Sequence, residues 1–116
     1  MTTEESNVLI AEFMCFKKDV VKNFYCVPKY YIETILWKDW CSIYEFEFDS
    51  SWNWLMPVVE KIEEDKNIHF KIYYKSCLIF RFTDVIISHT ENTKIKAVWK
   101  SVIDYIILEN GKNKDK

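Results

Sequence analysis

The stretch SSWNWLMPVVEKIE, residues 50–63, decides how the chain is expected to fold. Asp49, Ser50 and Ser51 are candidate caps for a helix that begins inside it. Pro57 removes one backbone hydrogen bond past the first turn, which predicts a loose first turn or a start nearer Asn53. Apolar side chains recur here at helical spacing and define the expected buried stripe: Trp52, Leu55, Val59 and Ile62.

A second helix is predicted at the start of the chain. Thr2 or Thr3 can cap it through a side-chain hydroxyl. Glu4 and Glu5 follow in the first turn, where negative charge is favourable beside the positive end of the helix dipole. Its buried side is expected to carry Leu9, Phe13 and Phe16.

A third helix is predicted from about Thr93 to Leu108, with Gly111 as its C-cap. Its apolar stripe consists of Ile95, Val98, Trp99, Val102 and Ile106. Residues 1–111 are therefore expected to form one domain, and residues 112–116 a disordered tail rich in lysine and asparagine.

Strands are predicted between the helices. A strand at 24–27 is expected to lie at a sheet edge or to end there, because Pro28 lacks a backbone donor. The β-prone residues 30–37 suggest another strand, which ends at a turn through Lys38 and Asp39. From residue 40 to 48, polar and apolar side chains alternate as in a strand with one solvent-exposed face. Glu45 and Glu47 are expected on the exposed face, and the buried face is expected to carry Trp40, Tyr44, Phe46 and Phe48.

Residues 68–74 and 78–88 are expected to form a β-hairpin. If Ile68, Phe70, Ile72 and Tyr74 share a face with Leu78, Phe80 and Phe82, opposite residue numbers sum to 152. This register places a three-residue loop at 75–77 and sets Lys71 directly across from Arg81. The predicted fold is α+β, with helices packed on a largely antiparallel sheet of about four to five strands, in the order helix, strands, helix, hairpin, helix.

Three blocks of the chain resemble the phage ABA sandwich family, small proteins of tailed phages and prophages that are mostly of unknown function. The stretch at 50–63 is similar to the family signature SWDWLMPVVEKIE, NVLIAEFM at 7–14 to NKLIAEFMG, and KIKAVWKSVIDYI at 94–106 to SKIEAVYKAVVEFI. These blocks cover roughly a third of the chain in the family's order. Cys15 stands where the family has glycine, and the segment 17–40 is richer in aromatics than the family pattern. The resemblance implies a lineage and a fold, not an activity.

Composition narrows the function classes. A net charge of −2 with both signs interspersed offers no basic face for a nucleic acid. No apolar run is long enough for a membrane span, and the start MTTEES lacks the features of a signal peptide, so a cytosolic location is expected. By the resemblance to phage proteins, this is the cytoplasm of the host cell. The four cysteines lack metal-ligand spacing and are expected to be free and mostly buried. No cofactor is expected.

Catalytic motifs are not found in the sequence. His69 and His89 have no recognisable partners, and no serine or cysteine lies in a nucleophile motif. With a single glycine at position 111, the phosphate-binding loop and the dinucleotide fingerprint are both excluded. The chain is therefore expected not to be an enzyme.

The candidate binding residues are Arg81, Lys71, Tyr73, His69 and Trp54. Lys71 and Arg81, placed opposite each other, would repel unless an anionic ligand, or Glu45 or Glu47 from a neighbouring strand, lay between them. Trp52 and Trp54 could stack on a base, although a core position is the more common use of such tryptophans and is expected more firmly for Trp52 than for Trp54.

Three functions follow as hypotheses. The first is a phage anti-defence protein that sequesters a nucleotide-derived immune signal, as a homo-oligomer whose aromatic content of 17% supplies stacking surface and subunit contacts. The second is an inhibitor that docks on a host defence enzyme through an aromatic patch at Tyr30, Tyr31, Ile35 and Trp37. The third is a phage accessory protein that only self-associates.

Overall fold

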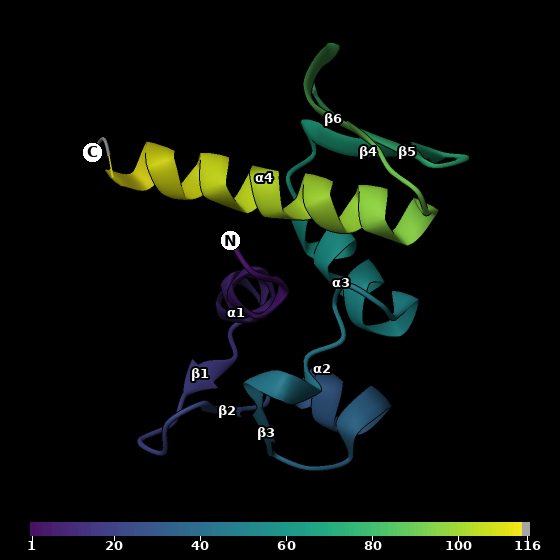
Figure 1. Cartoon of the computed structure of the whole chain (residues 1–116). Coiled ribbons are helices and arrows are strands. Elements are labelled where there is room, and N and C mark those ends of the chain that lie inside the picture. The colour runs from purple at the N-terminus through teal and green to yellow at the C-terminus, as the bar shows by residue number, and fades with distance from the viewer. Residues whose placement is uncertain (115–116) are drawn as a thin grey trace.

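The computed structural model describes residues 1–114 as an α+β fold with two three-stranded antiparallel sheets. The α+β class is confirmed, whereas the single sheet of four to five strands is replaced by sheets β1-β2-β3 and β4-β5-β6. Figure 1 shows α4 between the second sheet on one side and α1, α3 and the first sheet on the other. The elements are α1 (Thr3–Phe13), β1 (Lys17–Lys18), β2 (Phe24–Cys26), α2 (Lys29–Tyr31), the π-helix η1 (Ile32–Leu36), β3 (Trp40–Ser42), the 3-10 helix η2 (Ile43–Glu45), α3 (Trp52–Ile62), β4 (Ile68–Tyr73), β5 (Ser76–Arg81), β6 (Asp84–Thr90) and α4 (Lys94–Lys114).

The N-terminal helix begins as its sequence predicts. Thr2 Oγ1 accepts a hydrogen bond from the Glu5 backbone N–H at 3.1 Å, and Glu5 Oε1 accepts one from the Thr2 backbone at 3.1 Å. This reciprocal capping box satisfies two donors at the exposed helix end. The face turned to the core carries Ile10 and Ala11, while the expected Leu9 and Phe13 are only partly buried and the buried Phe16 follows the helix.

The predicted stripe of α4 is confirmed, and a buried polar bridge fixes the helix to α1. Trp99, on the stripe, donates its indole N–H to Asn7 Oδ1 at 2.9 Å. Asn7 in turn donates to Asp49 Oδ1 at 2.8 Å, so the bridge extends to the loop before α3. The helix does not end near Leu108, because Gly111 lies inside it. Residues 112–114 of the expected disordered tail continue the helix, and residues 115–116 lie outside the described part of the chain.

Both tryptophans at the start of α3 were expected in the core, and only one of them is there. Trp54 is 1% exposed and Trp52 is 38% exposed, so the stronger expectation of burial for Trp52 is wrong. Trp54 lies on the buried face of α3, which it shares with Leu55, Val58, Val59 and Ile62, and the Tyr31 hydroxyl donates to its backbone carbonyl at 2.9 Å. The indole of Trp54 is enclosed by four rings at centroid distances of 5.0 to 6.3 Å, those of Phe16, Tyr31, Phe46 and Phe48.

The segment 24–48 differs most from its sequence pattern. Strand β2 ends before Pro28 as predicted and lies at the centre of the first sheet. The strand predicted at 30–37 is wrong, because Pro28 starts the helix α2 and Tyr31 enters the aromatic core. The strand predicted at 40–48 stops at Ser42 and a 3-10 turn follows, so Trp40 and Tyr44 are exposed while Phe46 and Phe48 are buried.

The β4–β5 hairpin has a different register from the predicted one. Tyr73 pairs with Ser76 and Ile68 with Arg81, so opposite numbers sum to 149 around a two-residue loop. The expected three-residue loop at 75–77 is therefore wrong. The observed register buries Cys77 and Ile79 completely on the side of α4. The strand expected at 78–88 is divided by a second two-residue loop, which makes β6 a third strand.

Candidate functional site

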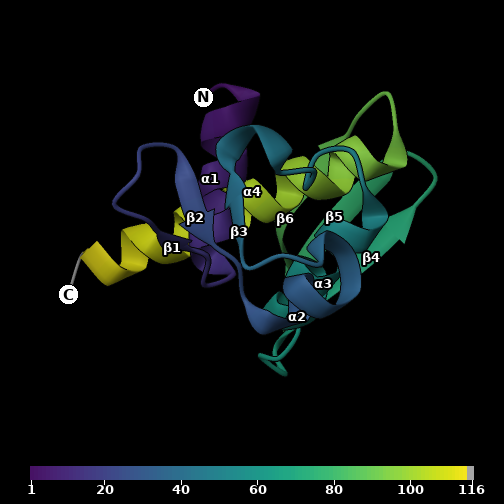
Figure 2. The same cartoon turned by 90° about the horizontal axis from the view of Figure 1, so that it is seen from below.

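One face of the sheet β4–β6 packs on α4, and the opposite face is open. Figures 1 and 2 show α4 along one side of this sheet, and in Figure 1 no other described helix covers the other side. Residues paired across antiparallel strands point to the same face, so the register defines which side chains lie there. We call them the open face: His69, Phe80 and Val85 in one row, Lys71, Leu78 and Ser88 in the next, and Tyr73, Ser76 and Thr90 in the last.

The open face combines aromatic, aliphatic and basic groups. The His69 ring stacks on Phe80, with centroids 4.9 Å apart and planes at 2°. The Lys71 ammonium lies 5.9 Å from the centre of the Tyr73 ring, a cation–π contact. Lys71 is the only one of the nine side chains that is charged when histidine is neutral. The surface is therefore mixed: Tyr73, Leu78, Phe80 and Val85 are its aromatic and aliphatic groups, and the positive charge of Lys71 at its centre suits an acidic, partly apolar partner.

Three of the five predicted binding residues lie together on this face, and two do not. His69, Lys71 and Tyr73 follow one another at alternate positions of β4. Arg81 points to the other side of the sheet, where its Nη2 lies 2.8 Å from Glu109 Oε1 on α4. Trp54 is buried in the core. The Lys71–Arg81 pair that motivated an anion site therefore does not form, because Lys71 faces Leu78 and Arg81 faces Ile68.

Both loops that connect the strands of this sheet carry an aromatic residue in a left-handed backbone conformation. Tyr74, with φ of 52°, is 75% exposed, and Phe82, with φ of 57°, is 65% exposed. Each is the first of two loop residues, a position at which positive φ favours glycine. Trp37, with φ of 58° and 79% exposed, occupies the equivalent glycine-favouring position after η1.

These aromatics are costly and add little to the core. An L-residue loses about 1 to 2 kcal/mol in the left-handed region. Exposed side chains recover little of that cost by burial. Asn23, at φ of 67° in the β1–β2 loop, is a residue that tolerates this conformation, whereas Cys15, at φ of 69°, Tyr74 and Phe82 are not. Backbone strain of this kind clusters at functional sites, which makes Tyr74 and Phe82 candidate site residues beyond both ends of the open face.

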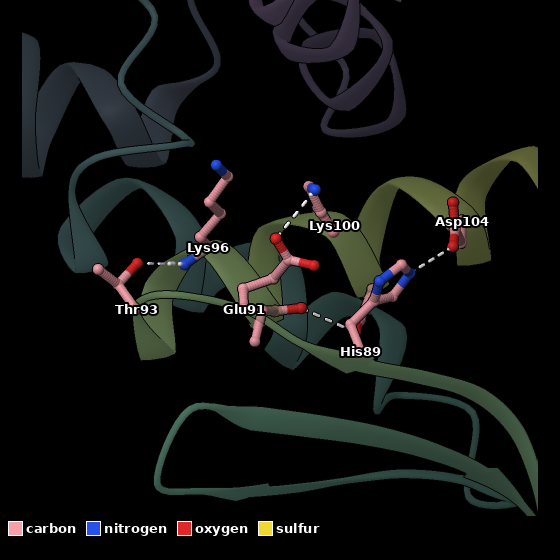
Figure 3. Close-up of polar contacts among 8 residues, drawn as sticks. His89, Glu91, Thr93, Lys96, Lys100 and Asp104 are labelled. Atoms are coloured by element: carbon pink, nitrogen blue, oxygen red, sulfur yellow. Dashed lines mark hydrogen bonds and ion pairs between the residues drawn. The ribbon is translucent and has the colours of Figure 1, made fainter.

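The inward side of β6 carries a different set of polar groups, shown in Figure 3. His89 Nε2 lies 2.5 Å from Asp104 Oδ2, and Lys100 Nζ lies 3.0 Å from Glu91 Oε1. Both contacts join β6, or the residue after it, to α4. A catalytic triad of cysteine, histidine and aspartate would need a thiol beside His89 and Asp104. The nearest thiol in the sheet is that of Cys77, which pairs with His89 across the strands. Burial raises the pKa of the Cys77 thiol, so the nucleophilic thiolate is disfavoured. This cluster is therefore best described as the attachment of the sheet to α4.

Sequence reasoning missed Tyr74 and Phe82 as site residues and placed Leu78 and Phe80 on the buried face. The only available signal was the composition of the loops, where aromatic residues stand in place of the usual glycine or asparagine. Among residues 1–114, no three His, Cys, Asp or Glu side chains are grouped as metal ligands. No helix in the same range is long and apolar enough to cross a membrane.

Comparisons with protein-family models, with curated proteins and with solved structures find no match to this chain. The resemblance to the phage ABA sandwich family therefore stays a prediction.

Proposed function

We propose that this chain is a non-catalytic binding protein that docks on an acidic, partly apolar surface of another protein through the open face and the two loop aromatics beside it. The observation that carries the proposal is the combination of strain and exposure at Tyr74 and Phe82. Positive charge at Lys71 favours a partner with carboxylates. By the resemblance to phage proteins, we further propose that the partner is a host defence enzyme in the host-cell cytoplasm, and that docking inhibits it.

The size of the open face indicates the strength of such a contact. The open face is three strands wide, with about 4.8 Å between strands, and about six residues long, with a rise of about 3.3 Å for each residue. Its area is therefore roughly 300 Å². A stable complex buries about 800 Å² on each partner, so the open face alone supports only a transient complex. Tyr74 and Phe82, at the two opposite ends of β5, lengthen the contact surface. Exposed aromatic residues of this kind are enriched at the centres of protein interfaces.

Photo-crosslinking from single positions tests the proposal. A benzoylphenylalanine at position 73 or 85 is expected to capture the same protein in the producing cell, because both positions lie on the open face. The matched control is position 44, where Tyr44 is exposed in η2 and away from this sheet. Equal capture from position 44, or no capture from positions 73 and 85, contradicts docking through the open face. Capture of a second copy identifies self-association as the function.

Sequestration of a nucleotide-derived signal is the second candidate, and one observation favours it. The stacked His69 and Phe80 rings lie one row from Lys71, which provides an aromatic surface for a base beside a cation for a phosphate. A nucleotide extract should then raise the melting temperature, because a ligand at a hundredfold excess over its Kd adds about 2.7 kcal/mol. No shift, together with crosslinking from position 73, favours the docking protein.

A further inference from the structure

A hollow of about 300 Å³ lies between the helical segment α2–η1 and the helix α3. Tyr30 and Trp52 provide aromatic walls on opposite helices, and Met56 and Pro57 complete the apolar lining. A second hollow of about 270 Å³ shares Tyr30, Pro57 and Glu60 with the first, so the two lie side by side along α3, and we call them together the groove. This groove is separate from the open face and uses none of its residues.

The groove presents hydrogen-bond acceptors on exposed residues, which a bound cation can reach. Pro57 has no backbone N–H, so the Asn53 carbonyl, which belongs to a residue lining the hollow, loses its usual partner four residues on. Glu60 lines both hollows and Glu64 the second, and neither forms an ion pair in the described part of the chain. Lys61 also lines the second hollow, but its ammonium makes no ion pair with either glutamate: it donates to the Phe13 carbonyl and lies over the Phe13 ring.

The position of these carboxylates makes them unfavourable for the fold alone. Glu60 lies in the last turn of α3 and Glu64 just after its end, where the helix dipole disfavours negative charge. They are four residues apart and of like sign, which adds a small repulsion. A cation in the groove relieves both effects and also gains cation–π contacts with the exposed faces of Tyr30 and Trp52.

We propose that this groove binds a small aliphatic diammonium. One ammonium group lies in the first hollow, where it donates to Glu60 and to the Asn53 carbonyl between the rings of Tyr30 and Trp52. The other lies in the second hollow near Glu64. A cation with N–H donors is required because carbonyl and carboxylate oxygens accept hydrogen bonds, which a quaternary ammonium cannot donate.

Calorimetric titration with 1,4-diaminobutane at low ionic strength tests the site. Saturable binding is expected, while the neutral analogue 1,4-butanediol and the donor-free tetramethylammonium bind more weakly or not at all. Glu60→Gln and Trp52→Leu should each weaken diamine binding about fivefold. The control Glu47→Gln removes an exposed carboxylate outside the groove and should leave binding unchanged.

Three outcomes overturn the proposal: no saturable binding up to roughly 10 mM diamine, equal binding of the diol, or equal weakening by Glu47→Gln and Glu60→Gln, which indicates nonspecific charge attraction. Phe82→Gly serves as a second control, since it alters the proposed docking surface and should not change diamine affinity. The proposal of a diamine site in the groove and the proposal of docking through the open face can therefore be refuted independently of each other.

Discussion

At position 82, the variant with glycine should be more stable than the variant with alanine, which is the reverse of the usual order. In an ordinary conformation, alanine is more stable than glycine by about 0.4 to 1 kcal/mol, because glycine loses more chain entropy on folding. At φ of 57°, alanine retains the clash of its Cβ, which costs about 1 to 2 kcal/mol, and glycine does not. The difference leaves Phe82→Gly more stable than Phe82→Ala by about 0.5 to 1 kcal/mol. Little burial is lost in either variant, since Phe82 is mostly exposed.

The assay is urea unfolding of both variants, with the same pair at Val85 as control. Val85 is also exposed but lies in strand β6, so alanine should be the more stable residue there. Thermal melting should show the same order, with about 4 °C for each kcal/mol. If alanine is more stable than glycine at both positions, Phe82 is not strained and the argument for its function loses its basis.

Four further predictions follow from the packing and charges. Trp99→Ala should cost about 3 to 5 kcal/mol in denaturant titration, since it leaves a cavity and removes the partner of Asn7; a loss under about 1 kcal/mol contradicts the assigned stripe. Gly111→Ala should raise stability by about 0.5 kcal/mol, because nothing lies within 4 Å of an added Cβ, whereas a glycine C-cap would give a loss. The Lys38 hydrogen bond lowers the pKa of Glu45, so its stabilisation is present above pH 4.5 and is lost as pH falls through the folded-state pKa; Glu45→Gln should flatten the stability curve below that pH. Sedimentation should detect a dimer or larger species at micromolar concentration, and a clean monomer counts against sequestration and favours docking on a different protein.

The three long helices, α1, α3 and α4, were predictable because their signals are local. The stripe of α4 and the capping box at Thr2 depend on residues three or four positions apart, which the sequence displays directly. The α+β class followed from the same patterns. The segment 30–37 was not predictable from propensity, because the contact of Tyr31 with Trp54 decides its conformation from 23 residues away.

The candidate site was only half predictable. The alternation of His69, Lys71 and Tyr73 placed these residues on one face, and they remain together. Register depends on where the loops begin, and neither Tyr74 nor Phe82 gives the glycine or asparagine signal of a tight turn. Shifting the hairpin to its true register moved Leu78 and Phe80 to the open face and Arg81 to the side of α4. The same residues that concealed the register thus define the proposed surface.

The most direct test of the docking surface is the crosslinking yield from position 85, compared between the natural chain and the Phe82→Gly variant. The variant keeps the backbone of the loop and releases its strain, so its fold should be retained in the unfolding assay. Capture from position 85 is expected to fall several-fold while the melting temperature does not decrease. Undiminished capture by a stably folded variant contradicts the role of the loop aromatic in docking.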